Sequence, residues 1–329
     1  MAIKLRLEIH RITLLKQVQG RKGKNYEQCS FSELLARFDA DKQKAFPLLW
    51  TRFVEYFQNE FQLNKEGDKA ITAKEDSKHS FSSTKNTISG EVSGGPTNRE
   101  QIIFKRKNAT KSTGKVDDDD VVSSDFFIKL WLPMERISGV MMIQSYSNSN
   151  ISDLVRLHFT KFVQQYGFKL ATTSYFPKAF LEEKNKNSNV VSVTYVKDKL
   201  SEDSRRLINP MFAEFDNLKV KIVVTGFRKS VDEFWQGFTQ SGRTLNTDID
   251  ALEFKADEDN KVVTIYKDEE GHETTMNIDK QRLRDFAYYT LPESVLQKGK
   301  NTYDFEAIRK HTDELLDKIK DEIKNPKKK

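Results

Sequence analysis

The chain has 329 residues, and its 23 Phe, 10 Tyr and 3 Trp can fill a core, which excludes an intrinsically disordered protein even though 32% of the residues are charged. The net charge of +6 permits binding to a polyanion without requiring it. The single cysteine excludes an intramolecular disulfide. No apolar stretch has the length of a membrane span, so we expect a cytoplasmic protein in a reducing compartment, with no membrane partner.

The amino-terminal segment is predicted to be a half-buried strand. Apolar residues alternate with polar ones over residues 3–9, which is the period of two of a strand with one buried face. The sequence "GRKGK" at residues 20–24 then interrupts the pattern. Glycine on both sides of the basic residues predicts a turn.

Two helices are expected next. Residues 31–38 predict a short helix capped by Ser30 or Ser32. Residues 46–63 predict a longer one, with Pro47 in its first turn. Its apolar side chains recur at intervals of four, which is typical of a helix with one buried side; they are Leu49, Phe53, Phe57 and Phe61.

Residues 64–123 are polar and are predicted to form a long insertion. The sequence "ISGEVSGGPTN" combines three glycines with a proline and therefore predicts a turn. The sequence "QIIFKRK" at residues 101–107 then predicts a strand.

The segment from residue 124 to residue 167 predicts two strands and a helix. The strands are "FFIKLWL" and "GVMMIQSY". The helix follows over residues 151–166, where Asn150 can cap its start and Gly167 can end it.

The remaining elements mix strands and helices. Residues 189–196 and 218–227 predict strands, residues 230–238 a capped helix, and residues 261–278 a hairpin around Glu270 and Gly271. The closing helix at residues 303–324 repeats apolar residues at intervals of three and four. That seam consists of Phe305, Ile308, Thr312, Leu315, Ile319 and Ile323.

Hairpins outnumber strand–helix alternations, which favours an α+β fold over a doubly wound α/β fold. We therefore expect two mixed strand/helix subdomains with antiparallel hairpins and a C-terminal amphipathic helix. The first would span residues 1–170 and carry the polar insertion 64–123. The second would span residues 188–329 and end in the helix 303–324.

No motif for nucleotide, zinc or serine-nucleophile chemistry is present: the sequence lacks GxxxxGK[ST], GxGxxG, HExxH, GxSxG and CxxC. Four adjacent carboxylates, Asp117–Asp120, raise the question of a metal site. Consecutive side chains on an extended chain point to opposite sides, and the block lacks the glycine and glutamate of a calcium loop. We predict a solvated acidic turn that balances neighbouring lysines.

A second hypothesis concerns catalysis by Glu253 and Lys255, which project to the same side if their segment is a strand. Together with an upstream acid, Asp232 or Asp216, this pattern resembles the carboxylate–carboxylate–x–lysine motif of restriction-type nucleases. The resemblance implies that the acids hold Mg²⁺ and that the lysine orients the attacking water. Otherwise no cofactor is expected. The alternative interpretation is a solvated strand face.

Basic residues gather in the predicted connections, where cations can follow a phosphate backbone and an aromatic ring can stack on bases. The alternative is an ordinary solubilising surface. The predicted nucleic-acid contacts are Arg21, Lys22, Lys24, Phe104, Lys105, Arg106, Lys107, Lys111, Lys115, Lys219, Lys221, Arg228 and Lys229.

Three functional hypotheses follow. The first is a non-catalytic, nucleic-acid-contacting subunit of a bacterial cytoplasmic assembly, in phage defence or a mobile-element system, a placement that rests on elimination. The second is the metal-dependent nuclease. The third is a protein-binding scaffold or an oligomer that associates through the C-terminal helix, if the seam of that helix does not cover its own domain.

Overall fold

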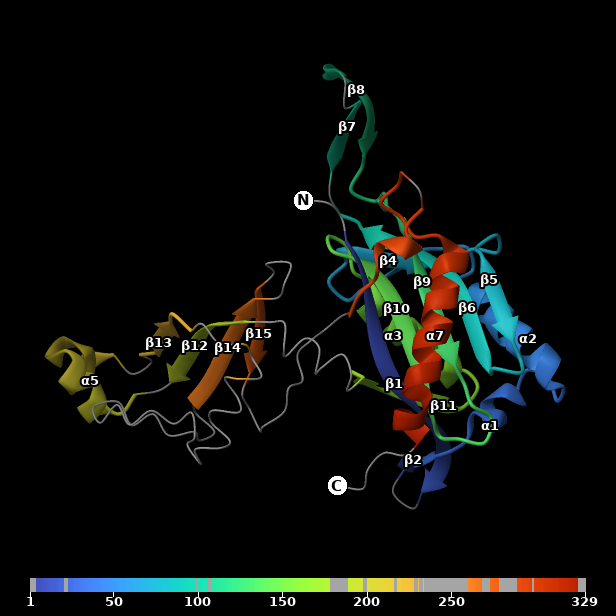
Figure 1. The fold of residues 1–329 in the computed structure, drawn as a ribbon, viewed down its shortest axis with the longest axis horizontal. Coiled ribbons are helices and arrows are strands. Elements are labelled where there is room, and N and C mark those ends of the chain that lie inside the picture. Colours follow the sequence, from blue (N-terminus) through green and yellow to red (C-terminus); the bar gives the residue numbers. More distant parts are fainter. Residues whose placement is uncertain are drawn as a thin grey trace. The chain divides into compact units, whose positions relative to one another are not determined.

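The computed structural model describes residues 4–20, 23–98, 100–105, 108–177, 189–197, 200–215, 218–227, 230, 233, 260–267, 273–277, 289–297 and 299–324. The chain divides into two compact units, one of Met1–Tyr175 with Tyr288–Lys329 and the other of Phe176–Ala287 (Figure 1). The expected second domain therefore does not extend to residue 329. The chain returns to the first unit for its C-terminal helix, because that helix buries its apolar side there.

Ten strands of the first unit form one sheet, with the main order β11-β1-β10-β9-β6-β4-β3. Every described strand pair is antiparallel, so the expected α+β class is confirmed. The strands are β1 (Leu5–Gly20), β2 (Gly23–Gln28), β3 (Gln62–Leu63), β4 (Lys69–Thr72), β5 (His79–Ser82), β6 (Thr87–Pro96), β9 (Ser124–Trp131), β10 (Ser138–Tyr146), β11 (Phe168–Ser174) and β16 (Tyr289–Thr290).

The first part of the expected polar insertion is in fact part of this sheet. Strands β4 to β6 lie there, and the glycine-rich segment predicted as a turn is β6, which is buried along nearly its whole length. A Cβ atom at Gly90 would lie 2.1 Å from the ring of Trp50, and one at Gly95 would lie 2.1 Å from the carbonyl oxygen of Val122. Glycine is needed here for close approach within a strand and not for a turn.

Three helices cover one face of the sheet: α1 (Phe31–Leu35), α2 (Lys42–Glu55) and α3 (Ser152–Gln164). Helix α2 begins earlier than predicted because Asp41 caps it by accepting a hydrogen bond from the Gln43 backbone N–H at 2.8 Å. Pro47 consequently lies inside the helix and not in its first turn.

An aromatic cluster joins α2 to α3 beneath this face. The Phe53 ring centroid lies 5.2 Å from that of Phe159 and 5.4 Å from that of Phe162, both edge to face. Phe57 adds a further edge-to-face contact with Phe53 at 5.3 Å. All four side chains are buried. Large rings in this geometry bury much apolar area and fix the angle between the helices.

Helix α7 (Phe305–Lys324) lies across the other face of the sheet (Figure 1). The alternation along β6 and β9 separates the two faces: Gly90 approaches Trp50 of α2, whereas Lys129 reaches α7. The predicted seam of α7 is buried at each of its six positions. Association with another molecule through that seam would therefore require α7 to leave its own sheet.

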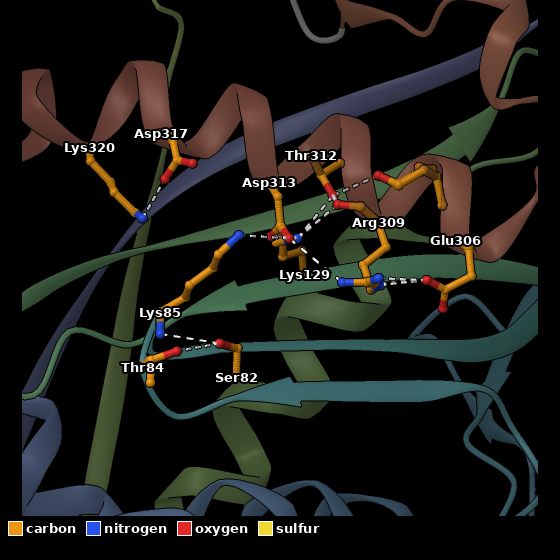
Figure 2. A network of polar contacts seen from close by, with 11 residues as sticks. Ser82, Thr84, Lys85, Lys129, Glu306, Arg309, Thr312, Asp313, Asp317 and Lys320 are labelled. Carbon is orange, nitrogen blue, oxygen red and sulfur yellow. Dashed lines mark hydrogen bonds and ion pairs between the residues drawn. The ribbon is translucent and has the colours of Figure 1, made fainter.

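A network of charged groups holds α7 in place (Figure 2). The buried Lys129 ammonium pairs with the Asp313 carboxylate and donates to Oγ1 of Thr312 and the backbone oxygen of Arg309, both at 3.2 Å. Lys85 approaches the other Asp313 oxygen at 3.4 Å. Burial lowers the pKa of Lys129, and its pairing with Asp313 opposes this effect. Burial would raise the pKa of Asp313, but Lys129 keeps it below its usual value.

The second unit contains a four-stranded antiparallel sheet of order β13-β12-β14-β15. Its strands are β12 (Asn189–Lys197), β13 (Val220–Thr225), β14 (Asn260–Lys267) and β15 (Glu273–Asn277). These agree with the predicted strands and with the predicted hairpin. Helix α5 (Glu202–Ile208) and the 3-10 helix η1 (Pro210–Glu214) lie between β12 and β13 in the sequence. Across both units, no described helix is long and apolar enough to cross a membrane.

Candidate nucleic-acid interface

Strands β7 (Gln101–Lys105) and β8 (Asn108–Val116) form a two-stranded antiparallel ribbon, called here the ribbon. It projects from the end of the ten-stranded sheet (Figure 1). Ile102 and Ile103 point to opposite faces of β7 because they are consecutive, yet they are 63% and 48% exposed. Neither face of the ribbon is covered at this point.

The ribbon is strongly basic. Residues 101–116 contain five bases and no acid. The backbone pairs Lys105 with Asn108 at the tip, and Lys111 lies on β8. Arg106 and Lys107, between the strands, lie outside the described residues. The concentration of cations toward the far end of an exposed ribbon makes this the strongest candidate for contact with a polyanion.

Acidic groups occupy the base of the ribbon. Asp117–Asp120 form an exposed turn in which the Asp117 N–H donates to a carboxylate oxygen of Asp120 at 2.9 Å. Thr97 donates its hydroxyl to the backbone oxygen of Asp120 at 2.8 Å, which ties the turn to the end of β6. The predicted solvated acidic turn is confirmed. Among the described residues, no group of three or more acidic, histidine or cysteine side chains could hold a metal ion.

One predicted phosphate contact is already paired. The Lys115 ammonium lies 2.7 Å from a carboxylate oxygen of Asp117 and 3.7 Å from one of Glu100. The hydrogen bond and charge of Asp117 raise the pKa of Lys115. Its charge is locally balanced, so we remove Lys115 from the candidate set and keep the other four bases of the ribbon.

Of the remaining predicted cations, only Lys24 has a described position relative to the ribbon. Lys24 lies on β2, at the opposite end of the sheet from the ribbon (Figure 1), and its side chain is not described. Arg21 and Lys22 beside it, and Arg228 and Lys229 after β13, lie outside the described residues. Lys219 and Lys221 are exposed but belong to the second unit. Among the described residues, the ribbon is thus the part of the chain where the backbone places several of the predicted contacts on neighbouring strands.

The nuclease hypothesis rests on four residues of the chain. Asp216, Asp232, Glu253 and Lys255 all lie outside the described residues. The Mg²⁺ that those acids were expected to bind therefore remains part of that prediction.

Sequence reasoning missed several buried titratable groups. Glu91 accepts a hydrogen bond from the Tyr303 hydroxyl at 2.9 Å and one from the Lys78 N–H at 3.2 Å. Burial raises the pKa of Glu91, and these two donors oppose the effect. The carboxylate connects β6 to the segment before α7. It is 7% exposed, so a structural role in closing the α7 face explains it.

A second buried pair lies on the opposite face of the sheet. Nε2 of His10 is 3.3 Å from a Glu8 oxygen, and Asn150 donates to the other Glu8 oxygen at 2.6 Å. Burial would raise the pKa of Glu8, but its hydrogen bonds with His10, Ser152 and Asn150 lower it overall. The pair holds the start of α3 against β1. The two residues are separated by one position in β1, which is the signal that could have identified them.

The chain matches no family model, no curated protein and no solved structure, so the functional argument rests on the residues and their geometry.

Proposed function

We propose that this chain is a non-catalytic, nucleic-acid-contacting subunit and that the ribbon makes the contact. The observation that carries the proposal is the exposed ribbon, whose sequence contains no acid and has four bases besides Lys115. These are Lys105, Arg106, Lys107 and Lys111. Membership of a bacterial defence or mobile-element assembly is the biological setting that we expect for this activity.

The shape of the ribbon suits a nucleic acid. A two-stranded β-ribbon fits the major groove of duplex DNA, and an aromatic side chain such as Phe104 can stack on an unpaired base. Bases close to the tip can neutralise phosphates and release their counterions. The acidic turn at Asp117–Asp120 repels phosphates and restricts the contact to the far part of the ribbon. The proposal thus predicts a small footprint.

The test measures the affinity of the full chain for labelled duplex and single-stranded DNA and RNA by fluorescence anisotropy over a range of salt concentrations. Four phosphate contacts predict a slope of log K against log salt of about −3 to −4 on duplex DNA. Replacing Lys105, Arg106, Lys107 and Lys111 with alanine is expected to weaken binding by about tenfold or more at low salt.

A matched variant separates the ribbon from net charge. Lys44, Lys65, Lys74 and Lys300 are exposed and lie outside the ribbon, and replacing all four with alanine removes the same charge. This control is expected to retain binding within about threefold, since its cations lie outside the ribbon. Equal losses in the two variants, or no binding by the unaltered chain at low salt, would refute the proposal.

The exposed isoleucines favour a second candidate, in which the ribbon docks on a partner protein. Ile102 and Ile103 supply apolar surface that phosphate binding does not use. Replacing both with serine is expected to leave the affinity for nucleic acid within about threefold if the cations carry the contact. A loss as large as that of the four-base variant would show that apolar contact dominates.

A further inference from the structure

The two faces of the ribbon differ in charge. In an antiparallel ladder, residues directly opposite each other lie on the same face. Ile102 pairs with Lys115, so both residues belong to one face. The Lys115 ammonium lies 2.7 Å from a carboxylate oxygen of Asp117 and 3.7 Å from one of Glu100. Two carboxylates therefore lie beside this face, and they repel the phosphates of a nucleic acid.

The opposite face contains Ile103, which is 48% exposed and pairs with Gly114. A Cβ atom at Gly114 would lie 3.6 Å from Cδ1 of Ile103. Among the ribbon side chains that the structure describes, none on this face is charged. Because glycine has no side chain, another molecule can approach the backbone closely here, next to an exposed apolar side chain.

The major groove of DNA offers such a side chain one kind of apolar group. In the B-form the groove is about 12 Å wide and admits a two-stranded ribbon, whose strands lie about 4.8 Å apart. The base edges in this groove display hydrogen-bonding groups and, at each thymine, a C5-methyl group. Duplex RNA offers no equivalent, because its major groove is deep and narrow and uracil lacks the methyl group.

We infer that Ile103 packs on thymine methyl groups in the major groove, so that the ligand of the ribbon is thymine-containing duplex DNA. The inference rests on the proposed function, because the basic residues of the ribbon supply the attraction to phosphates. In this orientation the Ile103 face lies against the base edges. The face of Lys115 then points out of the groove, which directs the carboxylates of Asp117 and Glu100 to solvent.

Replacing thymine with uracil in DNA removes the methyl group and leaves the phosphates and the base pairing unchanged. Fluorescence anisotropy compares the affinity of the full chain for an alternating dA·dT duplex with that for the matched dA·dU duplex. Loss of one buried methyl contact is expected to weaken binding by about threefold. The slope of log K against log salt is expected to be equal on both duplexes, since the phosphate contacts do not change.

Two matched variants identify the face that makes the contact. Ile103→Ser is expected to bind both duplexes equally. Ile102→Ser, on the face of Lys115, is expected to keep the preference for thymine. Both isoleucines are exposed, so neither variant is expected to unfold the chain, and thermal unfolding verifies this.

Salt-dependent binding with no preference for thymine over uracil overturns the inference and leaves the proposed function intact. A preference that survives Ile103→Ser, or one that Ile102→Ser removes equally well, also overturns it. If the chain binds no nucleic acid at low salt, the inference and the proposed function both fall, and docking of the ribbon on a partner protein becomes the alternative.

Discussion

The two faces of the ten-stranded sheet are covered by different chemistry. On the α2–α3 face, aromatic rings pack edge to face and Trp50 fits against Gly90. On the α7 face, the seam of the helix is apolar, but Lys129 and Glu91 from the sheet are buried beside it. Each of these two charged groups reaches a partner in the C-terminal segment, Asp313 and Tyr303 respectively.

This difference indicates that different effects hold the covering helices on the two faces. Burial of large rings is favourable wherever the shapes fit, so the α2–α3 face derives stability from area. A buried ion pair gains little net free energy, because desolvation offsets the attraction, yet removing one partner is costly. We infer that the polar groups of the α7 face fix the position of α7 more than they stabilise it. The second unit is inserted between β11 and β16. The polar groups that fix α7 therefore hold the last segment of the chain on the sheet that the chain left at β11.

The largest expected effect is on the aromatic face. Phe53→Ala removes a fully buried ring that contacts Phe57, Phe159 and Phe162. The free energy of unfolding is expected to fall by about 3–5 kcal/mol, because burial is lost and a cavity remains. Chemical denaturation of the purified chain measures the loss. Leu157→Ala, on the exposed side of α3 at 42% exposure, is the control and is expected to change stability by less than about 0.5 kcal/mol.

An asymmetric effect is expected at the ion pair of the α7 face. Asp313→Ala leaves the buried Lys129 ammonium without its carboxylate and is expected to destabilise the fold by about 3 kcal/mol. Lys129→Met keeps the length of the side chain, removes the charge and is expected to cost less than about 1 kcal/mol. The same denaturation experiment compares the two. Similar losses for both variants would mean that the pair itself provides net stability, contrary to the contrast drawn between the faces.

Regular periodicity made much of the fold predictable. The seam of α7 was predicted from intervals of three and four, and all six of its positions are buried. Helix α3 and the strands around it followed from the same kind of pattern, and Asn150 does accept a hydrogen bond from the Ser152 N–H at 2.7 Å. These signals are local, because one buried side of an element leaves its repeat in the sequence itself.

The errors arose at residues whose contact partner lies far away in the sequence. In the sequence, Gly90 suggests a turn, whereas in the structure the ring of Trp50 packs against it. The spacing of these two residues in the sequence gives no sign of that contact. Lys129 lies within an apolar strand and has no partner nearby in the sequence, because Asp313 lies on the last helix. The pairing of Lys115 with Asp117, in contrast, spans two positions and was predictable from the acidic turn. For the candidate site, sequence located the basic segment, and the backbone was needed to show that it forms an exposed ribbon.

The smallest expected effect is a difference in pH dependence between the two faces. On the α2–α3 face, burial lowers the pKa of His158 to about 4 from an ordinary value of 6.5. The unfolded chain therefore binds the proton more tightly, and stability is lost as the pH falls from about 6.5 toward about 4. His158→Gln cannot titrate and is expected to remove about 1–2 kcal/mol of the loss between pH 7.5 and pH 5.

Glu91 on the α7 face is expected to respond in the opposite direction. Burial raises its pKa above the ordinary 4.5, so the folded chain binds this proton more tightly than the unfolded chain does. Its contribution is fully present below the ordinary value and is lost as the pH rises through the raised value. Denaturation curves from pH 4 to pH 8 should therefore show that Glu91→Gln removes a decline toward high pH, whereas His158→Gln removes a decline toward low pH. If both variants flatten the same limb of the profile, the two faces do not differ in the way that their buried groups indicate.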